Sequence, residues 1–96
     1  MQIQTVTLTD VGPTIPVRID LSRFRNGAGL LVTVSDGATA TWSVQLSGDG
    51  VNWNDHDLLV TQTVSKNGNL AFPVLLIRLN GIVTDGTVTL VVIQAS

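Results

Sequence analysis

His56 is the only histidine of the chain, and it lies between two carboxylates, Asp55 and Asp57. A histidine beside an aspartate can act as a general base when a serine nucleophile is held against it. No Gly-x-Ser-x-Gly elbow marks a serine for that role. In an extended segment His56 could not share a face with both aspartates, because neighbouring side chains point to opposite faces. We therefore expect a turn histidine that hydrogen-bonds locally, and a chain that is not an enzyme.

Oxygen ligands for calcium could come from four polar side chains that lie close together in the sequence: Asp49, Asn52, Asp55 and Asp57. Their spacing does not match an EF-hand loop, which alternates its ligands and ends on a glutamate. The chain has no cysteine, so no thiolate metal site and no disulfide can form. Short polar side chains that satisfy backbone groups in a sharp loop are the expected outcome. No metal and no cofactor are predicted.

Residues 47–53 read Ser-x-Asp-Gly-x-x-Trp, a pattern that resembles the Asp-box hairpin of sialidases and a turn of discoidin-like domains. In those hairpins the motif is mainly structural, which implies that Trp53 packs beneath its turn. The alternative is a glycan-binding module, with Trp53 exposed beside Asp49, Asn52 and Asn54 in a concave site. Trp42 is in phase with Val44 and Leu46 and is expected in the core.

Two places are candidates for contacts with another subunit. Arg78 lies inside an apolar run, where its side chain must reach solvent, an aspartate or a neighbouring subunit. Arg23, Phe24 and Arg25 lie in the least strand-like segment of the chain, residues 21–29, which reads as a loop, with a short helical turn as the alternative. These four residues are the candidate interface side chains.

The composition is unusually apolar for a chain of this length. Of the 96 residues, 44% are hydrophobic and only 12% are charged, against about 25% charged in an ordinary globular domain. The mismatch indicates that like subunits or a partner protein cover some apolar surface. The net charge of −2 argues against a nucleic-acid partner, which requires a basic patch. No apolar run approaches the roughly 20 residues of a membrane span, and the N-terminus does not read as a secretory signal.

Short alternating runs separated by turn signals predict an all-β fold of seven or eight strands. A small antiparallel β-sandwich, jelly-roll or Ig-like, is the expected packing, and a closed barrel is the alternative. Residues 1–96 form one domain in this interpretation, with residues 1–9 as a candidate N-terminal arm.

Some local expectations are specific. Residues 58–64 are predicted to form a strand, and Asn80-Gly81 a turn. Residues 70–72 and 74–79, which flank Pro73, read as one strand broken by a bulge or as an edge strand. The apolar run from Leu90 to Ile93 predicts a final strand that is buried on both faces.

Three blocks in order, residues 42–57, 69–80 and 86–95, resemble small structural proteins of tailed bacteriophages. The resemblance covers roughly residues 30–95. It implies a virion protein assembled in the host cytoplasm, with capsid decoration or cement favoured over a neck or tail accessory role. The implied partners are the major capsid protein or other virion proteins, together with further copies of this chain. No catalytic residue comes with the resemblance.

Overall fold

The computed structural model describes residues 1–20, 27–70 and 74–94, which contain nine strands and no helix. Sheet A has the order β1 (Gln2–Leu8), β9 (Val88–Gln94), β4 (Ala28–Val34), β7 (Lys66–Leu70). Sheet B has the order β2 (Gly12–Pro13), β8 (Leu76–Asp85), β5 (Thr39–Ser47), β6 (Asn54–Asp55), and β3 (Val17–Arg18) also pairs with β8. All pairs are antiparallel.

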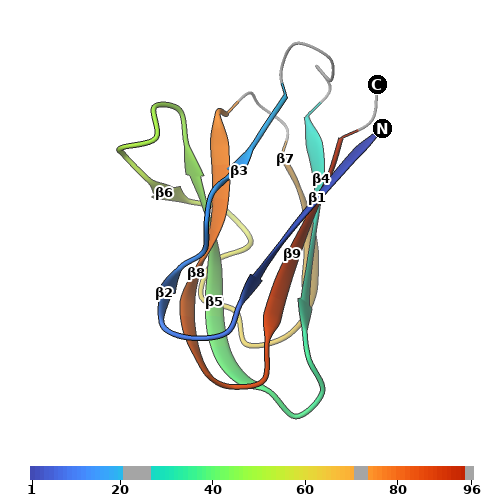
Figure 1. The fold of residues 1–96 in the computed structure, drawn as a ribbon, viewed down its shortest axis with the longest axis vertical. Helices are drawn as coiled ribbons and strands as arrows, with labels where there is room; N and C mark the ends of the chain where they lie inside the picture. Colours follow the sequence, from blue (N-terminus) through green and yellow to red (C-terminus); the bar gives the residue numbers. More distant parts are fainter. Residues whose placement is uncertain (21–26, 71–73, 95–96) are drawn as a thin grey trace.

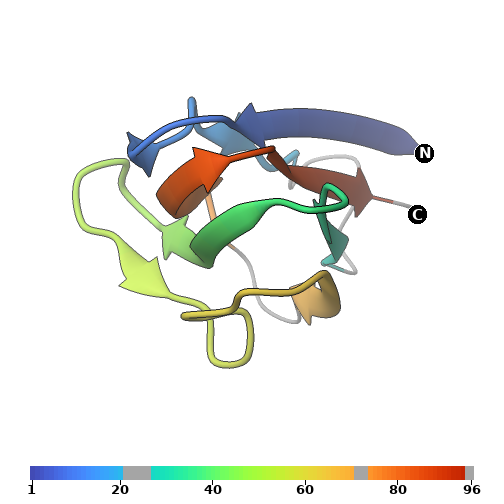
Figure 2. The same ribbon diagram turned by 90° about the horizontal axis from the view of Figure 1, so that it is seen from below.

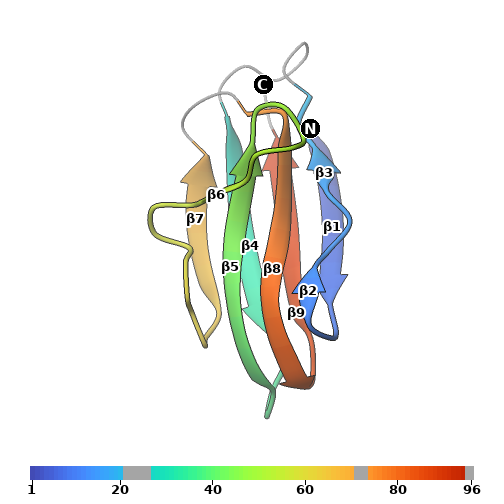
Figure 3. The ribbon, with the colours of Figure 1, turned by 90° about the vertical axis from the view of Figure 1, so that its left-hand side faces the viewer.

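The two sheets form two layers that face each other (Figures 1 and 2). Seen from the side of sheet B, its central strands β5 and β8 lie in front of β4 and β9 (Figure 3). Among the described residues, no strand of one sheet pairs with a strand of the other, so the fold is not closed into a barrel. The predicted all-β sandwich is confirmed, and the barrel alternative is wrong.

The core lies between the layers and is built from the inward positions of both sheets. β4 and β9 contribute alternate apolar residues, and β5 and β8 do the same from the opposite side. Trp42 is the largest fully buried side chain, and its indole Nε1 donates a hydrogen bond of 3.1 Å to the Val64 carbonyl oxygen. The prediction that Trp42 lies in the core is confirmed.

Residues 58–64 do not form the predicted strand. They follow the edge of β5 as a loop, with one isolated bridge between Gln62 and Trp42. Thr61 has a φ of 51°, a left-handed conformation that interrupts any extended run. The apolar residues here do not alternate between two faces, because only Leu59 is buried while Leu58 and Val64 are exposed.

Two further expectations about strand boundaries are wrong. Asn80 and Gly81 lie inside β8 and do not form a turn. The glycine is needed for another reason: β5 and β8 approach so closely here that only glycine fits opposite Trp42. β7 and β8 are separate strands in different sheets, so residues 70–79 are not one broken strand. Pro73 lies outside the described residues.

β9 is not buried on both faces. Val88, Leu90, Val92 and Gln94 are buried, and the residues between them are only half-buried. β9 is an inner strand of sheet A, so its apolar run fills the core with one set of side chains and supplies the outer surface of the sandwich with the other.

Candidate functional site

The outer surface of sheet A carries no charged side chain on its four described strands. The strand registers place Ile3 beside Ile93 and Val91 beside Leu31, with threonines and asparagines around them. We call this surface the sheet A face; its outward residues are Ile3, Thr5, Thr7, Gly29, Leu31, Thr33, Asn67, Asn69, Thr89, Val91 and Ile93. Apolar side chains that are neighbours across strands form a patch, and such patches mark contact sites more often than single exposed residues do.

A hollow of about 540 Å³ lies on the β4 and β7 side of this face, with Gly29, Leu31, Asn67, Asn69 and Ile93 among its lining residues. It forms because Gly29 has no side chain beside Ile93 and Asn69. A partner side chain could enter here without meeting a charge.

The outer surface of sheet B is polar and charged. Asp55 Oδ1 lies 3.3 Å from Gln45 Nε2, and the Arg78 Nε–H donates to Gln45 Oε1 over 2.9 Å. The Arg78 guanidinium lies over the indole of Trp53, 4.0 Å from the ring centroid. An arginine over an aromatic face is a favourable cation–π contact. These contacts join β6, β5 and β8 across the sheet, so Asp55, Gln45 and Arg78 are bonded to one another.

Residues 47–53 form a tight polar turn. The Ser47 hydroxyl accepts the Gly50 N–H at 2.8 Å, and Asp49 Oδ1 accepts the N–H groups of Val51 and Asn52, each at 2.8 Å. The Asn52 side-chain amide donates to Asp49 Oδ2 at 2.9 Å. These bonds, led by those from the Asn52 and Val51 backbones, hold the pKa of the Asp49 carboxyl well below its ordinary range.

The glycan alternative required Asp49, Asn52, Trp53 and Asn54 to line one open site. Both oxygens of Asp49 are taken up by the turn, as is the Asn52 amide. Trp53 is half-buried and Arg78 covers one face of its ring. Asn54 is exposed on β6, where it pairs with Leu46. A sugar that stacked on the Arg78 side of Trp53 would have to displace the guanidinium.

His56 is buried, and both of its ring nitrogens meet backbone groups. Nδ1 accepts the N–H groups of Leu58 and Leu59, each at 3.1 Å, so the ring hydrogen lies on Nε2. Nε2 is 2.9 Å from the carbonyl oxygen of Asn69, to which it donates. His56 therefore fastens the loop after β6 to the end of β7, and the predicted local hydrogen bonding is what the structure shows.

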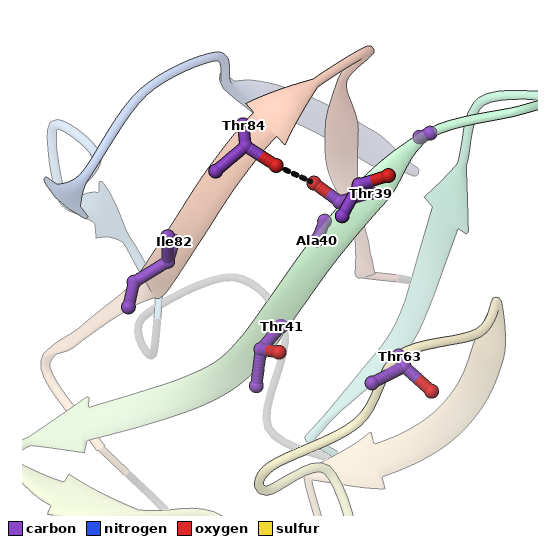
Figure 4. Close-up of a pocket in the computed structure, with 7 residues that line it drawn as sticks. Thr39, Ala40, Thr41, Thr63, Ile82 and Thr84 are labelled. Atoms are coloured by element: carbon purple, nitrogen blue, oxygen red, sulfur yellow. Dashed lines mark hydrogen bonds between the residues drawn. The ribbon is translucent and has the colours of Figure 1, made fainter.

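A second hollow, of about 370 Å³, lies at the other end of the outer surface of sheet B (Figure 4). Thr39, Thr41, Thr63 and Thr84 line it together with Ile82 and two alanines. The Thr84 hydroxyl is bonded to the Thr39 carbonyl oxygen at 3.2 Å (Figure 4). Its lining residues offer hydroxyl groups and include no titratable side chain.

Arg78 is the candidate interface residue that the structure places, and its described partners are Gln45 and Trp53. Arg23, Phe24 and Arg25 lie outside the described residues. Within the described part of the chain, no three histidine or acidic side chains gather as a metal site would require. The same residues contain no helix of the length and hydropathy needed to cross a membrane.

The chain was compared with models of protein families, with curated proteins and with solved structures. None of the three comparisons found a match. Any proposal for the function of this chain therefore depends on its sequence and on the geometry of its two outer surfaces.

The sheet A face was not identified from the sequence. Its signal was present as outward positions without a charge in residues 2–8, 28–34 and 88–94. The apolar run of β9 made this face hard to recognise. A run of apolar residues is expected both for a strand buried on its two faces and for a strand with one apolar face at the surface.

Proposed function

We propose that this chain is a non-catalytic structural protein of bacteriophage virions, a capsid decoration or cement protein that binds across neighbouring coat subunits. The phage assignment has its support in the sequence resemblance over residues 30–95. The binding role has its support in the sheet A face, and that face is the observation on which the proposal depends.

The sheet A face fits a protein partner better than it fits open water. Ile3, Leu31, Val91 and Ile93 form cross-strand neighbours with no charge among them. Each square ångström of apolar surface that a coat subunit covers contributes about 25 cal/mol to association, before the costs of ordering. The uncharged rim of threonines can hydrogen-bond without the penalty of burying an ion.

A decoration protein does not need a strong individual site. A shell repeats the same contact many times, so modest affinity at each site is amplified when the chain is itself a homo-oligomer that spans neighbouring coat subunits. In this proposal the partners are the major capsid protein and further copies of the chain, and the location is the virion, assembled in the host cytoplasm. The backbone contacts of His56 favour a structural over a catalytic role.

The test is co-sedimentation of the purified chain with capsids and, separately, with tails of the phage that encodes it. We expect saturable binding to capsids at a copy number comparable with that of the coat subunits, and none to tails. Binding to tails alone would replace the capsid role with the neck or tail accessory role. Absence of the chain from purified virions by mass spectrometry would contradict the proposal as a whole.

A further inference from the structure

The four edges of the two sheets are protected to very different degrees. On sheet B, the outer edge of β5 is covered by β6 and then by the following loop, which forms hydrogen bonds with Trp42 and Val44. The opposite edge, along β8, is covered by β2, Thr14, β3 and Ile19. These covering segments are short, and Pro13 and Pro16 cannot donate a backbone hydrogen bond to a further strand.

Sheet A ends in β7 on one side and β1 on the other. β7 has five residues and includes Lys66 and Gly68, a charge and a weak strand former of the kind that discourage edge pairing. β1 has seven residues, Gln-Ile-Gln-Thr-Val-Thr-Leu, with no charge, proline or glycine. Among the described residues, its backbone hydrogen-bonds only to β9. No described segment therefore pairs with the outer edge of β1, which is a regular strand along its whole length.

We propose that β1 pairs with β1 of a second copy of this chain, antiparallel and about a two-fold axis at Thr5. This inference specifies how the homo-oligomer of the proposed function would form. It rests on that part of the proposed function and not on the capsid role. An isologous contact of this kind presents the same strand from both partners and closes the edge of each.

The register follows from the side-chain alternation. Residues that face each other across an antiparallel pair lie on the same side of the sheet, so outward positions must meet outward positions. A two-fold axis through a residue meets this condition, and an axis between two residues does not. Centring on Thr5, the middle of Gln2–Leu8, uses the whole strand.

This register is chemically self-compatible, which is the argument for a second copy over a different partner. Thr5 meets Thr5 of the second copy, and Ile3 meets Thr7 of the second copy, so no like charges are opposed. The sheet A faces of the two copies then become one continuous surface, with the apolar pairs of each copy on the same side.

The first measurement is the mass of the full chain by light scattering after size exclusion. A dimer of about twice 10.2 kDa is expected. A monomer at high micromolar concentration would overturn the inference.

The second measurement uses charge at the axis. Thr5→Lys and Thr5→Glu should each be monomeric, because like charges would meet at the two-fold axis, and an equimolar mixture should restore the dimer. Thr33→Lys is the matched control, since Thr33 is also exposed on the sheet A face but lies on an inner strand. Far-ultraviolet circular dichroism verifies that each variant is folded.

A mixture that stays monomeric would overturn pairing at Thr5. Loss of the dimer in Thr33→Lys as well would overturn edge pairing in favour of contact through the face. Capsid co-sedimentation separates the two proposals. A monomer that binds capsids overturns this inference alone, and a dimer that does not bind them overturns only the proposed function.

Discussion

The outer surfaces of the two sheets follow the same strand alternation but differ in charge. Sheet B carries Arg18, Asp55 and Arg78, and the last two are linked through Gln45. The sheet A face carries no charge, and its apolar residues are cross-strand neighbours. Of the other exposed apolar side chains, Ile15 and Val51 lie in loops, and Ile82 lies on the outer surface of sheet B. On sheet B, charged side chains are bonded to neighbouring polar groups, whereas the sheet A face is uncharged and partly apolar, as the proposed contact with a partner requires.

The largest expected difference between the two sheets is in the stability lost when a glycine is replaced by alanine. A Cβ at Gly81 in β8 would overlap the Thr41 carbonyl oxygen and lie 2.9 Å from Trp42 Cα. Gly81→Ala should therefore destabilise the fold by roughly 3 kcal/mol, because the backbones of β5 and β8 must separate. Gly29→Ala in β4 meets nothing closer than 3.9 Å and should stay within about 0.5 kcal/mol of the wild type. Urea unfolding measures both, and equal effects would contradict this account of strand packing.

Substitutions of His56 test the link between the loop after β6 and strand β7 of sheet A. His56→Ala leaves the N–H groups of Leu58 and Leu59 and the Asn69 carbonyl without their partner, which should cost roughly 2 kcal/mol. His56→Asn keeps a local acceptor for the loop but cannot reach Asn69, so about half the loss is expected. Thermal denaturation should therefore place the stability of His56→Asn between that of the wild type and that of His56→Ala. Equal losses in the two variants would show that the loop contacts contribute little beside the bond to Asn69 in β7.

Arg78 tests whether the polar surface of sheet B is self-contained. Arg78→Ala should cost only about 0.5–1 kcal/mol and shift the Trp53 emission to longer wavelength as the ring becomes exposed. Wild-type protein should show no fluorescence change on titration with simple sugars. A saturable change that disappears in Trp53→Phe would support the glycan-binding alternative instead.

The smallest effect is the acid dependence of the 47–53 turn. The folded state lowers the pKa of Asp49, so its ionised form stabilises the fold above the ordinary aspartate pKa of about 3.9. This contribution should be complete at neutral pH and decline as the pH falls below that value. Asp49→Asn should flatten stability between about pH 4 and pH 2 relative to the wild type. Parallel pH profiles for the two proteins would contradict the role assigned to the carboxylate.

The fold class was predictable because period-two alternation survives in long strands such as β1, β4 and β5. Local turn signals were less informative. Asn80-Gly81 reads as a turn, but its glycine serves close strand approach at Trp42, a tertiary requirement that the dipeptide does not reveal. Leu58–Val64 was misassigned because bridging to β5 needs a left-handed residue at Thr61, which sequence propensity disfavours.

The sheet A face could not be predicted from the sequence, because it depends on the order of the strands in the sheet, which local sequence patterns do not reveal. Ile3, Val91 and Leu31 are distant along the chain, and only the order β1-β9-β4 makes them neighbours. Arg78 was correctly singled out as a side chain in need of a partner, yet its contact with Trp53 depends on the path of the turn before β6.

The most direct test of the account introduces one lysine into each outer surface. Val91→Lys places a charge at the centre of the sheet A face, and Thr41→Lys places one at an exposed position on sheet B. With both variants folded, capsid co-sedimentation should weaken about tenfold or more for Val91→Lys and stay near wild type for Thr41→Lys. Equal binding by the two variants, or a loss confined to Thr41→Lys, would contradict the claim that the sheet A face is the surface covered in the assembly.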